Sequence, residues 1–240
     1  YARFSKYEAR ATSTGGEQDA LDALRQDVTA RFVADHLAAR TSRVLDIGCA
    51  NGGLLRVLHQ LGFRRLYGLD PSAVCVANAM TVPGVDARIG SLLSERLFTP
   101  EGLGEFDGVV LSHVLEHLRD LSSAAQRLRS ATRVGGMLYV EVPDAARYAD
   151  HVVAPFQDFN TEHLNHFSPR SLHNLLGPVG FAEIAIHRKT LPLPAGARYP
   201  ALGVLYRRAD APSSVVTDDG DEELAEGIAR YLRASQAMLV

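Results

Sequence analysis

The segment VLDIGCANGG, residues 44–53, decides the fold of this chain. It follows an apolar run that is typical of a strand over residues 43–47, turns through glycines, and opens a helix predicted over residues 52–61, with Gly62 ending it. Glycines in such a turn let the backbone approach a ligand and offer N–H groups at a helix N-terminus. In open α/β sheets, ligands bind where the strands end. The segment therefore predicts a ligand site at the end of a parallel strand.

Strand and helix patterns alternate downstream of this segment. Further strands are predicted over residues 66–69, 85–89, 106–112 and 137–142, and helices over residues 72–80 and 118–132. A longer helical pattern precedes the segment, over residues 17–39. This alternation favours a doubly wound parallel sheet with helices on both faces.

The alternation stops after Pro143. Residues 144–167 are rich in His, Asp, Asn and aromatic residues and are interpreted as an irregular insertion that covers the site at the strand ends. A helix is predicted from Ser168, as N-cap, to residue 176. Two strands, over residues 181–187 and 202–207 and joined by the Pro- and Gly-rich stretch 191–200, then complete a sheet of seven strands.

The two ends of the chain lie outside the predicted domain, which spans residues 17–209. Residues 1–16 are interpreted as an arm or lid, and residues 210–220 as a linker. A last helix over residues 222–240 carries apolar residues that have no later partner in the sequence. We therefore expect that helix either to pack on a second subunit, as in a homodimer, or to begin a second domain that is missing.

Composition narrows the class of function. The 240 residues carry a net charge of -3, so no basic excess is available for nucleic acid. No apolar run approaches the ~20 residues of a membrane span, and the N-terminus lacks a signal peptide. The two cysteines form no ligand-spaced cluster. These observations predict a reduced cytoplasmic protein without a structural zinc site.

Two carboxylates indicate the cofactor class. Asp70 ends the second predicted strand, where a carboxylate can bind the hydroxyls of a ribose. That position predicts a nucleoside-containing cofactor, either S-adenosylmethionine or NAD. Asp46 precedes the first glycine by two residues and would repel a pyrophosphate, whereas a ligand with an ammonium group tolerates it. Ala50 also replaces the second glycine of the pyrophosphate fingerprint, so S-adenosylmethionine is favoured.

Four ordered segments strengthen this prediction. LDIGCANGG (45–53), GLDPS (68–72), FDGVVLSHVLEHL (106–118) and GGMLYVEVP (135–143) together resemble class I S-adenosylmethionine-dependent methyltransferases. The resemblance covers about residues 40–190 and implies a Rossmann-like seven-stranded sheet that ends in an antiparallel hairpin.

The resemblance also implies roles for single residues. The methionine part of the cofactor would be surrounded by Asp46, Gly48, Ala50 and Gly52. Asp70 would bind the ribose, and Pro71 and Ser91 would lie near the adenine. Ser112 and His113 would border the methyl group and the acceptor. The family commonly has glycine at the position of Ala50 and aspartate at that of Ser91.

Two histidine clusters are candidates for removing a proton from the acceptor. One is His113-x-x-Glu116-His117, although the last two residues also suit an ordinary helix start. The other, Glu162-His163, opens the pattern EHxxHFSxxSLxxLLxxxGF over residues 162–181. This pattern is similar to that of methyltransferases that act at carbon on nucleotide-linked sugars, in which the Glu-His pair lies at the acceptor site. The similarity implies His163 as the base, assisted by Glu162, with His113 as second candidate.

The sequence departs from those sugar enzymes at two places. It has no cysteine-rich zinc-binding arm, and Asn160 stands where an aromatic hydroxyl is expected. His163 and His166 are three residues apart with one carboxylate beside them, which is thin evidence for a metal, and we expect none.

The sequence thus predicts a methyltransferase that acts on a small-molecule acceptor. A sugar or nucleotide-sugar is the first expectation, and a phenolic or polyketide-like hydroxyl the second; methylation at oxygen or at carbon stays open. Two alternatives remain. One is an NAD-dependent dehydrogenase or epimerase, and the other a domain that binds S-adenosylmethionine without turnover.

Overall fold

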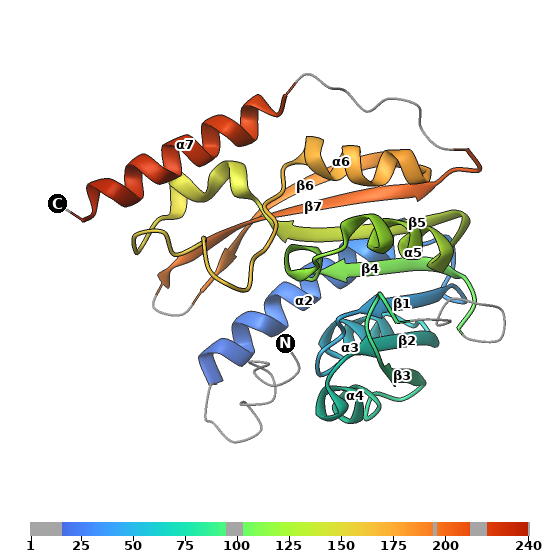
Figure 1. The fold of residues 1–240 in the computed structure, drawn as a ribbon. Helices are drawn as coiled ribbons and strands as arrows, with labels where there is room; N and C mark the ends of the chain where they lie inside the picture. The colour runs from blue at the N-terminus through green and yellow to red at the C-terminus, as the bar shows by residue number, and fades with distance from the viewer. Residues whose placement is uncertain (1–15, 95–102, 194–195, 212–219, 240) are drawn as a thin grey trace.

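A computed structural model describes residues 16–94, 103–193, 196–211 and 220–239 (Figure 1). Within these residues, seven strands form one mixed sheet in the order β3-β2-β1-β4-β5-β7-β6. The first five strands in the chain pair in parallel, and β7 pairs antiparallel with both β5 and β6. They are β1 (Arg43–Ile47), β2 (Arg65–Asp70), β3 (Val85–Ile89), β4 (Phe106–Ser112), β5 (Thr132–Pro143), β6 (Phe181–Pro192) and β7 (Arg198–Arg208). The predicted fold is confirmed, including the antiparallel hairpin.

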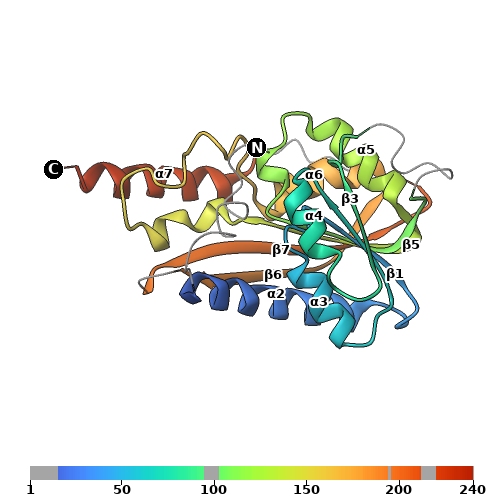
Figure 2. The same cartoon turned by 90° about the horizontal axis from the view of Figure 1, so that it is seen from below.

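Helices cover both faces of the sheet (Figure 2). One face packs against α2 (Gly16–His36), α3 (Gly53–Gln60) and α4 (Ala73–Ala79), and the other against α5 (Leu121–Ala131) and α6 (Pro169–Leu176). Each face has its own apolar core, because neighbouring side chains of a strand point to opposite faces. Parallel strands buried on both sides are the reason for the continuous apolar runs in the sequence.

Side chains of β1 and β4 illustrate this division. Leu45 of β1 and Val109 of β4 belong to the core beside α5 and α6. Their neighbours Val44 and Val110 belong to the core beside α2 and α3. All four side chains are fully buried, so each strand contributes to both cores.

The order of the strands reverses between β1 and β4. The chain runs outward from β1 to β3, and then returns to place β4 on the other side of β1. The turns that follow β1 and β4 lie against each other at this point: a Cβ on Gly48 would lie 2.6 Å from Val114 Cγ2. This is the place where open α/β sheets bind ligands.

Several boundaries differ from the prediction. The helix expected over 118–132 begins at Leu121, because the Asp120 side chain caps it by accepting a hydrogen bond from the Ser123 N–H. Strand β5 follows that helix directly, at Thr132. Half of the stretch 191–200 belongs to the strands of the hairpin, since β6 extends to Pro192 and β7 starts at Arg198.

The insertion and the C-terminal helix pack on each other. Two short 3₁₀ helices, η2 (Leu115–His117) and η3 (Ala145–His151), follow β4 and β5, and η4 (Gly177–Val179) follows α6. In Figure 1, α7 (Glu222–Ala237) lies beside the segment of η3. Tyr231 of α7 is fully buried, with ring centroids 5.5 Å from Tyr148 and 5.1 Å from Phe159. The apolar side of this helix therefore has a partner that precedes it in the sequence.

Some expectations lie wholly or largely outside the described residues. The arm over residues 1–16 is described only at its last residue, and the linker over 210–220 only at its two ends. Of the helices that the structure does describe, none combines the length and the apolar character that crossing a membrane requires. Cys49 and Cys75 are both buried, and neither forms a disulfide within the described residues.

Candidate active site

In the turn after β1, every second residue has a left-handed backbone conformation. Gly48, Ala50 and Gly52 have φ angles of 76°, 44° and 74°, in the left-handed region that favours glycine. A Cβ on Gly52 would lie 2.8 Å from Ala79 Cα, so this position requires glycine for space as well. Alanine reaches this region at a cost of about 1–2 kcal/mol. The glycines predicted as ligand-binding residues are therefore needed to form the turn itself.

Asp46 and Asp70 lie close to this turn and are both buried. The Asp70 carboxylate accepts hydrogen bonds of 2.9 Å from the N–H groups of Ala50 and Ser72, which fix its position. Burial, together with the negative charge of Asp70, raises the pKa of Asp46 to about 8. A ligand that brings a positive charge next to Asp46 would be bound more tightly by its ionised form.

Three further predicted residues follow the ends of neighbouring strands. Pro71 directly follows β2, and Ser91 lies two residues after β3, where its N–H donates to Ser94 Oγ at 2.9 Å. Ser112 ends β4, and its hydroxyl lies 3.5 Å from Glu141 Oε1. The sheet thus brings these residues to one edge, where the β1 turn also lies; their contacts with a cofactor stay predictions.

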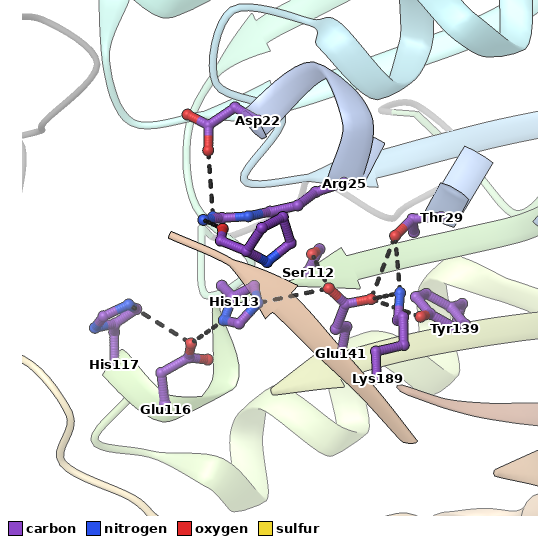
Figure 3. A network of polar contacts seen from close by, with 11 residues as sticks. Asp22, Arg25, Thr29, Ser112, His113, Glu116, His117, Tyr139, Glu141 and Lys189 are labelled. Atoms are coloured by element: carbon purple, nitrogen blue, oxygen red, sulfur yellow. Dashed lines mark hydrogen bonds and ion pairs between the residues drawn. The ribbon is translucent and has the colours of Figure 1, made fainter. Parts of the chain in front are cut away.

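A buried polar network surrounds Glu141, near the end of β5 (Figure 3). Glu141 Oε2 accepts hydrogen bonds from the Tyr139 hydroxyl at 2.6 Å and from Thr29 Oγ1 at 3.3 Å, and forms an ion pair with Lys189 Nζ. Burial alone would raise the pKa of Glu141. The hydrogen bond from His113 and the charge of Lys189 outweigh it and hold this pKa well below its usual range. Glu141 is therefore a fixed negative charge beside the site.

His113 connects this network to the turn after β4. It has a φ of 55°, a strained conformation that places its ring between two carboxylates. Its Nδ1 lies 3.1 Å from Glu116 Oε1, and its Nε2 lies 3.5 Å from Glu141 Oε1 (Figure 3). Burial alone would lower the pKa of His113, but the two carboxylates raise it to about 9. His113 is consequently a cation at neutral pH.

The insertion is fixed on η2 by backbone hydrogen bonds. The Glu116 carbonyl accepts the N–H groups of Leu164 at 2.8 Å and Asn165 at 3.1 Å. In the other direction, His117 Nδ1 lies 2.8 Å from the Glu162 carbonyl oxygen and donates to it. The segment that carries the second histidine cluster therefore covers the first.

His163 lies beside His117, with ring centroids 5.2 Å apart. Burial lowers the pKa of His163, which keeps the imidazole neutral. Its Nδ1 is buried and has no hydrogen-bond partner among the described residues. His163 thus lies beside this cluster and has one buried nitrogen that no described residue pairs.

The other two members of the predicted second cluster lie elsewhere. His166 contacts Tyr148 and Phe159, with ring centroids 5.8 and 4.9 Å away. Glu162 is exposed, and it meets the site through its backbone carbonyl. The structure therefore joins His163 to His117 and Glu116, rather than to the side chain of Glu162 or to His166.

Sequence reasoning missed the residues that stabilise the charge of Glu141. Thr29 comes from α2, and Lys189 from β6, far from the cofactor turn in the sequence. The one available signal was Glu141 itself, a charged residue in the otherwise apolar run MLYVEV. A charged residue inside a buried strand requires a partner, but the sequence does not say where that partner lies.

This fold, with an acidic residue before the glycine turn and another at the end of β2, is that of the methyltransferase class. The family model described as "Methyltransferase domain" matches residues 18–186, and the chain belongs to this family. Among curated relatives, it is 27% identical over 197 residues to a ubiquinone biosynthesis O-methyltransferase of Xanthomonas campestris pv. campestris. That match covers 80% of this chain and 78% of the relative.

Solved structures agree in fold. One neighbour is a putative methyltransferase of Haloferax volcanii in complex with the Trm112 activator. Its TM-score is 0.65 and its identity 16%, over 85% of this chain and 98% of the other. A second is an S-adenosylmethionine-dependent methyltransferase from Mesorhizobium loti, with a TM-score of 0.56 and 20% identity, over 70% and 91% of the two chains.

The protein is thus a methyltransferase, and its cofactor is S-adenosylmethionine. The site fits this cofactor, because the raised pKa of Asp46 marks a buried carboxyl group without a compensating cation and Asp70 is held rigidly at the end of β2. The match to the methyltransferase family, rather than the charge of these two residues, favours S-adenosylmethionine over the NAD-dependent alternative.

Proposed function

We propose that the protein transfers a methyl group from S-adenosylmethionine to a hydroxyl oxygen of a small molecule. The acceptor would lie between the turns after β4 and β5 and the segment 160–167. One observation carries this proposal: the covering segment places His163, with its unpaired buried nitrogen, on the turn that contacts the cofactor loop. The relatives named O-methyltransferases favour oxygen over carbon as the acceptor atom.

The cofactor side of the site follows from the sheet edge. The methionine part would be held at the β1 turn by Asp46, Gly48, Ala50 and Gly52. The nucleoside would be held by Asp70 at the end of β2, with Pro71 and Ser91. Ser112, at the end of β4, would border the methyl group. When bound, S-adenosylmethionine supplies a methyl group activated by its sulfonium. The protein then has to align the acceptor oxygen and to accommodate the loss of its proton.

We assign removal of this proton to His163. Its Nδ1 has no partner among the described residues, whereas His113 already contacts the carboxylates of Glu116 and Glu141. His113 therefore serves better to orient groups at the border of the two subsites than to accept a proton. Glu162 supports the site through its carbonyl, which fixes the ring of His117.

Two classes of acceptor are compatible with the proposed function. The pattern EHxxHFS at residues 162–168 favours a sugar or nucleotide-sugar hydroxyl. The relatives that are ubiquinone biosynthesis O-methyltransferases favour the hydroxyl of a ubiquinone precursor. A panel that contains nucleotide sugars, simple phenols and vicinal diphenols separates the two by release of S-adenosylhomocysteine.

The test compares two variants that affect different steps. Asp70→Ala should weaken cofactor binding at least about tenfold, because it removes a ribose ligand and the acceptor of two backbone N–H groups. His163→Ala should leave the cofactor Kd within about twofold and lower kcat on the best acceptor about 100-fold or more. His173→Ala, a histidine of α6, is the matched control and should change neither quantity.

Two results would contradict the proposal. Full activity of His163→Ala would remove this residue from the reaction. Tight cofactor binding without S-adenosylhomocysteine release from any hydroxyl acceptor would favour methylation at another atom or a domain without turnover.

A further inference from the structure

Three side chains from two distant segments meet beneath the insertion. A carboxylate oxygen of Glu116, a ring nitrogen of His117 and a ring nitrogen of His163 all lie within 4.8 Å of one another. Zinc ligands sit at about 2.0–2.2 Å from the ion, so two of them are at most about 4.4 Å apart. Small rotations of these side chains would therefore bring all three onto one ion.

The ring of His117 is already fixed in the orientation that a ligand needs. Its Nδ1 donates to the Glu162 carbonyl at 2.8 Å, so in the neutral tautomer Nε2 is the nitrogen that can bind a metal, and it lies 3.9 Å from Glu116 Oε1. Histidines that bind metals nearly always donate their other N–H to a carbonyl or carboxylate in this way.

Glu116 and His163 both hold buried polar atoms that no hydrogen bond satisfies. Glu116 is 0% exposed, and its Oε2 has no partner among the described residues; the same is true of His163 Nδ1. An unsatisfied buried polar atom costs about 1–3 kcal/mol, and more when it is charged. Two such atoms in one cluster call for a ligand that pairs with both, and a cation does so.

The cluster is also rigidly supported. Asn160 Oδ1 accepts the His163 N–H at 3.0 Å, and the Asn165 side chain donates to the carbonyls of Leu115 at 3.3 Å and Leu118 at 2.7 Å. With the two bonds to the Glu116 carbonyl, these contacts fix the backbone that carries the three side chains. Such support is what a preorganised metal site requires.

We infer that Glu116, His117 and His163 bind one divalent transition-metal ion. Two imidazoles and one carboxylate suit Zn²⁺ and ions like it, whereas Mg²⁺ and Ca²⁺ prefer oxygen ligands throughout. Three protein ligands leave at least one coordination position for water or for an acceptor oxygen. The sequence had indicated no metal, because it paired His163 with His166 and could not place η2 against the insertion.

The inference deepens the proposed function and rests on it for the position of the acceptor. It changes the role of His163 from that of the base to that of a ligand of an ion, and this ion lowers the pKa of a bound hydroxyl. Binding of the ion requires neither the cofactor nor turnover, so it can be measured independently of activity.

The experiment uses the untagged full chain, freed of metal by a chelator. Zn²⁺ binding is followed by calorimetry, and Co²⁺ binding by its visible absorption, which becomes intense at low coordination number. We expect one ion per chain, with Glu116→Gln, His117→Gln and His163→Ala each weakening Zn²⁺ binding at least about tenfold. Circular dichroism and the cofactor Kd show whether each variant is folded.

His166→Gln is the matched control, because this histidine lies in the same insertion but outside the cluster. It should leave Zn²⁺ binding unchanged. The inference is overturned if the chain binds no Zn²⁺ or Co²⁺, if all three ligand variants bind as the parent does, or if only His166→Gln loses binding.

Activity separates failure of this inference from failure of the proposed function. Transfer to a hydroxyl that survives complete removal of metal, and that His163→Ala alone abolishes, retains the proposed function with His163 as base. Metal binding by the cluster without transfer to any hydroxyl retains the ion and discards the acceptor.

Discussion

Lys189 and Glu141 form an ion pair across β7, the strand that separates their own strands. In the sheet register, Lys189 pairs with Ala201 of β7, and Glu141 pairs with Gly203. A Cβ on Gly203 would lie 2.4 Å from the Tyr139 hydroxyl, so the missing side chain leaves room for the group that donates to Glu141. The antiparallel hairpin thus supplies a charge that stabilises the active-site edge.

Removal of Lys189 should therefore destabilise the protein strongly. Lys189→Met leaves Glu141 buried without its cation and should lower the free energy of unfolding by about 3–5 kcal/mol. Urea denaturation measures this change. Arg31→Met, which breaks the exposed pair between Arg31 and Asp27, is the control and should have no measurable effect. A loss for Lys189→Met no larger than that of the control would show that Glu141 is stabilised by other groups.

Cofactor binding should release a proton from Asp46. The pKa of this carboxyl group is about 8 in the cofactor-free protein, so the group is mostly protonated at pH 7. The positive charges of the cofactor favour its ionised form, and release should approach about one proton at pH 7 and decline above pH 8. Calorimetry in two buffers of different ionisation enthalpy measures the number of protons. Asp46→Asn should bind the cofactor more weakly and release none.

The same carboxyl group should make stability depend on pH. Its pKa is raised on folding, so its contribution to stability is present below the unfolded value of 3.8 and is lost as pH rises toward 8. Asp46→Asn should remove this loss, which makes the variant more stable than the parent at pH 8 and above. Thermal unfolding at several pH values tests this; parallel melting curves of the two proteins would contradict it.

Replacement of Ala50 by glycine should be tolerated or favourable. Ala50→Gly relieves a left-handed conformation that costs about 1–2 kcal/mol and adds unfolded-chain entropy of about 0.5–1 kcal/mol. The expected outcome is a gain of up to about 1 kcal/mol in the free energy of unfolding, with the cofactor Kd within about twofold. Ala124→Gly in α5, where the backbone is helical, is the control and should lose about 1 kcal/mol or more. Equal losses in both variants would show that Ala50 is not strained.

Replacement of Gly227 in α7 by alanine should be destabilising, although alanine is ordinarily favoured in helices. A Cβ at this position would lie 2.5 Å from Ala146 Cα, so Gly227→Ala should weaken the packing of α7 on η3 by about 1–3 kcal/mol. Hydrogen exchange over residues 145–159 and 222–237 should accelerate. Glu226→Ala, at the exposed neighbouring position, should leave this exchange unchanged. Slower exchange in Gly227→Ala would mean that helix propensity outweighs the close contact.

The sequence predicted those features that depend on neighbouring residues. The strands, their order of alternation with helices and the glycine turn all leave local patterns, and the carboxylates Asp46 and Asp70 follow directly from them. The position of Lys189 against Glu141 depends on the register of a hairpin, which composition does not encode. The meeting of His117 and His163 depends on the path of an insertion without periodicity, fixed by backbone bonds that any residue could make.

Because α7 packs on the insertion, the cofactor turn and the covering segment are stabilised by different parts of the structure. The cofactor turn is fixed by the sheet itself, through bonds from Gly48 and Cys49 to the Leu69 carbonyl. The covering segment is held by hydrogen bonds to α7, because the N–H groups of Phe156 and Asp158 donate to side chains of that helix. Under the proposed function, we therefore expect changes in α7 to alter the choice of acceptor while the affinity for the methyl donor stays the same.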